Sequence, residues 1–177
     1  MDFDSNRYII TGGSGSGKSS IIYELQGRGY TCYQEISRIV IYEQQMKCGD
    51  MLPWMNMEAF AEECFRRMKE QLNKRHDQPS FFDRGIPDIT AYLKSRKLPM
   101  HFDLDTWASC YNSYVFVCPP WKDIFVNDPQ RPESFSDSKH IYQLLRSIYR
   151  NLNFIVVEVP RLSVKERADY ILATIKG

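Results

Sequence analysis

A glycine-rich stretch near the start of the chain holds the residue types best suited to chemistry. Residues 12–19 read Gly-Gly-Ser-Gly-Ser-Gly-Lys-Ser, which satisfies the pattern Gly-x-x-x-x-Gly-Lys-Ser. The glycines let the backbone turn with its N–H groups pointing inward, so the loop and the next helix can hold phosphate oxygens. The candidate phosphate-binding residues are Gly12, Gly13, Ser14, Gly15, Ser16, Gly17, Lys18, Ser19 and Ser20.

Two side chains of this loop have separate expected roles. The Lys18 ammonium is expected to bridge the β- and γ-phosphates of ATP or GTP, and the Ser19 hydroxyl is expected to bind Mg²⁺. Ser20 is a weaker candidate. The alternative, a merely flexible glycine and serine turn, is rare when Lys-Ser and a following helix are in register.

A second polar group follows the apolar pair Phe81-Phe82. Asp83 ends this short apolar strand, where a carboxylate can hold Mg²⁺ directly or through water. The alternative for Asp83 is a turn or helix cap. The guanidinium of Arg84 can bind phosphate oxygens or an anionic substrate group, and the alternative is an ion pair with Asp88 or Glu35.

The elements that position these residues alternate along the chain. Apolar runs predict strands, and three- and four-residue spacing of apolar side chains predicts helices. Such alternation indicates a mostly parallel sheet with helices on both faces, in one domain spanning residues 1–177. The expected strands are 8–10, 31–35, 81–82, 114–118 and 154–157, and the expected helices are 19–25, 36–45, 57–72, 103–110, 141–152 and 164–175.

Composition narrows the classes of partner. The chain has 23 Lys and Arg against 22 Asp and Glu, so it has no large positive electrostatic potential that would favour nucleic acid. An ATPase that acts on nucleic acid is therefore the least favoured of the hypotheses. Its five cysteines have no metal-binding spacing and are read as reduced thiols. No secretory signal or run of about 18 apolar residues is present, so we expect a cytoplasmic protein without a transmembrane segment.

Several motifs together resemble one known group. They are residues 12–19, 35–38, 52–54, 82–88 with 91–93, and 131–149. The chain is similar to the predicted AAA-type P-loop ATPases related to the ribosylnicotinamide kinase domain of NadR. This resemblance implies the fold of nucleoside and nucleotide kinases, with a five-stranded parallel sheet of order 2-3-1-4-5 and a lid at about residues 119–140.

The resemblance adds two candidate catalytic residues. Glu35 closes the second expected strand at the edge where open α/β folds bind ligands, and similar nucleoside kinases place a general base there. The alternative for Glu35 is a surface carboxylate paired with Arg38. Arg131 follows the fourth strand, where similar kinases carry lid arginines that stabilise the transferred phosphoryl group. A solvated loop arginine is the alternative. Between Glu35 and Arg38 this chain has Ile36-Ser37, whereas members of the similar group often have small residues such as alanine at these two positions.

Two functions stay open on the sequence. The first is Mg²⁺-dependent phosphoryl transfer from ATP or GTP to a small-molecule acceptor such as a nucleoside. The second is a nucleotide-dependent switch that acts on a protein or an anionic lipid. A Ras-type GTPase is disfavoured because the Asn-Lys pair at 73–74 continues as Arg-His and lacks the guanine-recognition motif.

Overall fold

A parallel sheet forms the centre of the molecule. The computed structural model describes residues 6–74, 77–126 and 133–176. The five strands of this sheet pair in the order β2-β3-β1-β4-β5, which confirms the expected order. They are β1 (Arg7–Gly12), β2 (Thr31–Tyr33), β3 (Ser80–Asp83), β4 (Tyr114–Cys118) and β5 (Ile155–Glu158).

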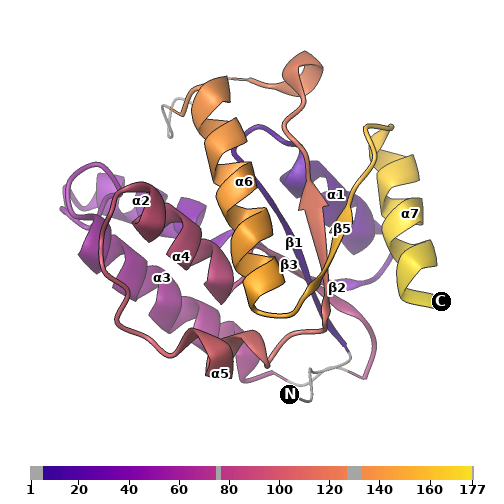
Figure 1. Ribbon diagram of the computed structural model, residues 1–177, viewed down its shortest axis with the longest axis horizontal. Helices are drawn as coiled ribbons and strands as arrows, with labels where there is room; N and C mark the ends of the chain where they lie inside the picture. The colour runs from indigo at the N-terminus through magenta and orange to yellow at the C-terminus, as the bar shows by residue number, and fades with distance from the viewer. Residues whose placement is uncertain (1–5, 75–76, 127–132, 177) are drawn as a thin grey trace.

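Helices cover both faces of the sheet, as Figure 1 shows. One buried cluster joins α1 and α7 to Ile10, Phe81 and Phe116, and the other joins α2, α3, α4 and α6 to Ile9 and Phe82. Successive strand residues therefore enter opposite cores, as the period of two requires. The helical elements are α1 (Lys18–Gly27), α2 (Ile36–Met46), α3 (Met57–Leu72), α4 (Ile86–Ser95), α5 (Leu104–Ala108), the 3₁₀ turn η1 (Lys122–Ile124), α6 (Phe135–Asn151) and α7 (Val164–Lys176).

Three differences from the sequence prediction bear on the candidate site. β2 ends at Tyr33, so Glu35 does not close this strand but directly precedes α2. α4 was not predicted, because its ten residues begin beside Pro87 and present a short apolar pattern. α6 begins at Phe135 rather than Ile141, since its first turn is polar and is fixed by a Ser134–Asp137 capping box.

The register of the sheet brings the sequence motifs together. β1 lies between β3 and β4, with Ile10 opposite Asp83 and Gly12 opposite Cys118. The carboxyl ends of parallel strands share one edge, so the glycine-rich loop after β1 and the polar residues after β3 are neighbours. In the described part of the chain, every helix is too short or too polar to cross a membrane.

Candidate functional site

The glycine-rich loop joins β1 to α1, as the motif requires. Gly12 has a φ of 144°, and a β-carbon there would stand 2.4 Å from the Cys118 carbonyl oxygen, so only glycine fits. Gly17 has a φ of 79° and directly precedes α1. The loop therefore presents a backbone turn at a helix N-terminus, which is the geometry that binds phosphate.

Lys18 lies buried at the mouth of this loop. Its Nζ donates to the Gly13 carbonyl oxygen at 2.8 Å and stands 3.4 Å from Ser16 Oγ. Burial, and then the charge of Arg84, lowers the pKa of Lys18. Ser20 is exposed, whereas the other candidate residues of the loop are buried or half-buried.

Ser19 and Asp83 come together from distant parts of the sequence. Ser19 Oγ donates to Asp83 Oδ2 at 3.0 Å, while Asp83 Oδ1 is buried without a hydrogen-bond partner. A hydroxyl beside an unsatisfied carboxylate oxygen suits Mg²⁺, which takes oxygen ligands and keeps part of its coordination for water and phosphate. Burial, and then the charge of Glu35, raises the pKa of Asp83 to about 6, and a bound cation would favour its ionised form.

Asp83→Asn tests this metal assignment. We expect it to weaken Mg²⁺-dependent triphosphate binding by at least about tenfold and to leave binding in EDTA within about twofold, because only the cation needs the carboxylate charge. Calorimetric titration with and without Mg²⁺ measures both values. The exposed Asp77→Asn is the control. Equal Mg²⁺ dependence in wild type and Asp83→Asn would remove Asp83 from the metal site.

Arg84 links the loop to two carboxylates. Its Nε donates to Glu35 Oε1 at 2.6 Å, and its NH1 nitrogen donates to the Gly12 carbonyl oxygen at 3.0 Å and lies 3.3 Å from Asp88 Oδ1. Both ion pairs named as alternatives from the sequence are therefore present. The NH2 nitrogen is buried without a hydrogen-bond partner, so one donor of the guanidinium is still available.

Glu35 is buried, with 5% of its surface exposed, which contradicts the alternative of a surface carboxylate. Its Oε1 accepts from Ser37 Oγ at 2.7 Å in addition to Arg84, and the Arg38 guanidinium stands 4.0 Å from Oε2. The strand position expected for Glu35 was wrong. The side chain is nevertheless linked to the phosphate-binding loop, because Arg84 donates hydrogen bonds both to Glu35 and to the Gly12 carbonyl oxygen.

Asp88 is a site residue to which the sequence assigned no role of its own. Its carboxylate accepts from the Gly85 backbone N–H at 3.1 Å and from the Tyr149 hydroxyl at 2.5 Å. Thr11 Oγ1 also donates to it. Asp88 therefore fixes Arg84 against β1 and α6. Its position in the first turn of α4 was the available signal, but α4 itself was not predicted.

The segment expected to form a lid contacts the loop at both of its described ends. A β-carbon on Gly15 would lie 2.5 Å from the Phe125 ring, and Ser138 Oγ donates to the Ser14 carbonyl oxygen at 2.8 Å. Residues 135–140 belong to α6 rather than to a loop. Arg131 lies outside the residues that the structure describes.

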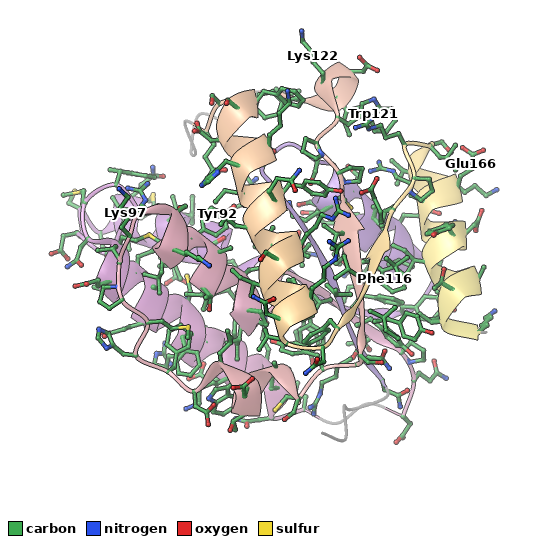
Figure 2. The ribbon with its side chains drawn as sticks, in the orientation of Figure 1. Tyr92, Lys97, Phe116, Trp121, Lys122 and Glu166 are labelled. Carbon is green, nitrogen blue, oxygen red and sulfur yellow. The ribbon has the colours of Figure 1, made fainter. Side chains whose placement is uncertain are left out.

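A cavity of about 120 Å³ lies beside Arg84. Buried Arg84 and Asp88 line one part of it, while exposed Trp54 and Arg96 line another, so it leads from the surface to the guanidinium. Tyr92, labelled in Figure 2, places its ring 5.2 Å from the Arg84 guanidinium carbon. Most of the lining is apolar and comes from Ile41, Met57, Phe60, Ala61, Met68 and Ile89.

The chain is similar to one protein family and to several solved structures. A family model described as an AAA domain matches residues 7–167. No curated protein sequence matches the chain. A solved deoxyadenosine kinase from M. mycoides with bound dCTP is 17% identical, with 96% of this chain and 98% of that chain covered and a TM-score of 0.58. A shikimate kinase from Acinetobacter baumannii with shikimate is 15% identical, with coverages of 97% and 93% and a TM-score of 0.60.

Proposed function

The chain belongs to the AAA-domain family of P-loop proteins, and from this premise we propose that it transfers the γ-phosphoryl group of ATP or GTP to a small-molecule hydroxyl. A nucleoside is the proposed type of acceptor. The observation that carries the proposal is the apolar cavity that reaches Arg84, whose guanidinium contacts both Glu35 and the phosphate-binding loop. A protein that only binds and releases nucleotide has no need of this cavity.

The donor half of the reaction uses the loop. Its backbone N–H groups and Lys18 hold the phosphates, with the γ-phosphate directed towards Arg84. Ser19 and Asp83 would hold Mg²⁺, which neutralises charge on the β- and γ-phosphates when it is bound. Arg131 keeps its proposed role in stabilising charge on the transferred group.

The acceptor half uses Glu35 and Arg84. In the proposed mechanism, Glu35 removes the proton from the acceptor hydroxyl, and the available NH2 donor of Arg84 binds either that oxygen or the transferred group. Three carboxylates, Glu35, Asp83 and Asp88, lie near the buried cations Lys18 and Arg84, and the half-exposed Arg38 stands 4.0 Å from Glu35. An uncharged acceptor suits this balance better than an anionic one, because a further negative charge would face Glu35 and Asp88.

The cavity also favours an acceptor with a flat, weakly polar body. Small-molecule sites combine apolar walls with a few polar groups that fix orientation. Here the walls are mainly aliphatic and aromatic, and Arg84 and Asp88 supply charged groups at the buried end. A nucleoside offers both a ring for the walls and a hydroxyl for the Arg84 end.

Ala61→Leu tests the cavity as the acceptor site. The added carbons would fill part of the cavity, so we expect the acceptor KM to rise at least about tenfold while the triphosphate Kd stays within about twofold. Ala59→Leu is a matched control, because Ala59 lies on the same helix and does not line the cavity. An equal acceptor KM in both variants would place the acceptor elsewhere.

Stimulated nucleotide turnover tests the function itself. ADP or GDP release is measured in Mg²⁺ with the tighter-binding triphosphate, first alone and then with each of a panel of nucleosides. The proposal predicts slow release alone and clear stimulation by at least one nucleoside. Tight triphosphate binding without stimulation by any small hydroxyl compound would favour the switch, with a protein or anionic lipid partner.

A further inference from the structure

α7 carries a buried arginine that packs against the phosphate-binding loop. Arg167 is 4% exposed and precedes Ala168 on the face of α7 that also buries Ile171. Its NH1 nitrogen lies 3.4 Å from the Ser16 carbonyl oxygen, to which it donates. A β-carbon on Gly17 would stand 2.8 Å from the same nitrogen. The guanidinium therefore touches the last turn of the loop before α1.

This arginine has no carboxylate partner among the residues that the structure describes. The contacts found for Arg167 are the Ser16 carbonyl and the Trp121 ring, whose centroid is 5.7 Å from its guanidinium carbon, and its Nε is buried without a hydrogen bond. Figure 2 shows Trp121 between η1 and the start of α7. Arg84, equally buried, contacts two carboxylates. A buried charge without a counter-ion costs folding free energy, so binding of an anion near Arg167 would be favourable.

The contact also has a direction. A trans peptide group is planar, and its C=O and N–H point to opposite sides. The Ser16 carbonyl and the Gly17 N–H belong to one such group, so an arginine that holds the carbonyl on one side directs the N–H to the other. Gly17 N–H is among the donors assigned to phosphate. Arg167 is thus placed to orient a phosphate donor.

We infer that Arg167 is a positioning residue of the nucleotide site, and that the bound triphosphate supplies the counter-ion for its buried charge. The inference rests on the triphosphate site of the proposed function, but it is independent of the acceptor. Arg167 acts through the Ser16–Gly17 peptide and through its charge, without contact to the reacting atoms. The sequence signal was its place beside Ala168, four residues before Ile171, on the inward face of α7.

A series of ligands with increasing phosphate charge separates this role from a purely structural one. Wild type, Arg167→Met and Arg167→Lys are titrated calorimetrically with adenosine, AMP, ADP and ATP in Mg²⁺, and with the guanosine series in parallel. We expect Arg167→Met to lose at least about tenfold in triphosphate affinity, less for the diphosphate and monophosphate, and nothing for the nucleoside. Arg167→Lys should fall between wild type and Arg167→Met.

Thermal unfolding gives a second readout. Without nucleotide, Arg167→Met is expected to melt at or above the wild-type temperature, because it lacks the uncompensated charge, and its triphosphate-induced rise in Tm should be smaller. The exposed Arg150→Met controls for the loss of one positive charge. Equal losses along the ligand series, no loss, or a lower Tm with an unchanged triphosphate-induced rise would overturn the inference. If wild type binds no triphosphate, the proposed function fails as well.

Discussion

Lys18→Ala is expected to abolish nucleotide turnover, by at least about 10²–10³-fold, and to weaken triphosphate binding. The ammonium is buried at the loop, where a charge acts on the phosphates with little screening by water. Within the part of the chain that the structure describes, its hydrogen bonds run only to the loop residues Gly13 and Ser16, so the fold should survive. Steady-state turnover and calorimetric affinity measure the two effects, and circular dichroism reports the fold.

Lys122→Ala is the matched control for Lys18→Ala. Lys122 is exposed in η1, and Figure 2 shows it pointing away from the molecule. Its loss removes the same charge without touching the phosphate-binding loop, so turnover should stay near the wild-type value. Unchanged turnover in Lys18→Ala itself would contradict the assignment of the nucleotide site.

Glu35→Gln is expected to retain triphosphate binding and to lose acceptor phosphorylation by about 10²–10⁴-fold. Glutamine keeps an oxygen that can accept from Arg84 and Ser37, but it has no negative charge and cannot take up the acceptor proton. The kcat for acceptor phosphorylation and the triphosphate Kd are measured separately. Full activity of Glu35→Gln would return Glu35 to a structural role as the partner of Arg84.

The ion pair with Arg84 requires a further control. Glu35 lies 2.6 Å from Arg84, so Glu35→Gln also removes one of the two carboxylates beside a buried guanidinium. Ser37→Ala removes the other side-chain donor to Glu35 Oε1 while it keeps the charge. If Glu35 is the general base, Ser37→Ala should cost far less than Glu35→Gln, and the Tm of both variants shows how much of each loss comes from the fold.

The parts of the fold that could be predicted from sequence depend mostly on patterns among residues close together in the chain. The phosphate-binding loop depends on glycine conformations and on a neighbouring strand and helix, all within residues 7–27, so it could be recognised without distant contacts. The strand 114–118 was predicted with its observed bounds, because a continuous β-branched and aromatic run ends at two prolines. The order of the strands came from the family resemblance rather than from the local pattern.

Long-range contacts account for what sequence reasoning missed. Asp88 gains its role from Thr11 and Tyr149, which lie on β1 and α6, and Arg167 gains its role from Ser16 and Trp121. No spacing rule joins positions so far apart in the chain. The proximity of Asp83 and Ser19 could be predicted, because Asp83 ends β3, Ser19 lies just after β1 at the start of α1, and the carboxyl ends of these parallel strands share one edge.

Direct detection of the phosphorylated product is the most decisive measurement for the proposed reaction. Wild type is incubated with Mg²⁺, γ-labelled ATP or GTP and individual nucleosides, and the products are separated and identified by mass spectrometry. Phosphoryl transfer predicts that the label appears in a phosphomonoester of one acceptor, in an amount equal to the nucleoside diphosphate released, and that Lys18→Ala forms none. Label found only in inorganic phosphate, whichever hydroxyl compound is supplied, would contradict a kinase.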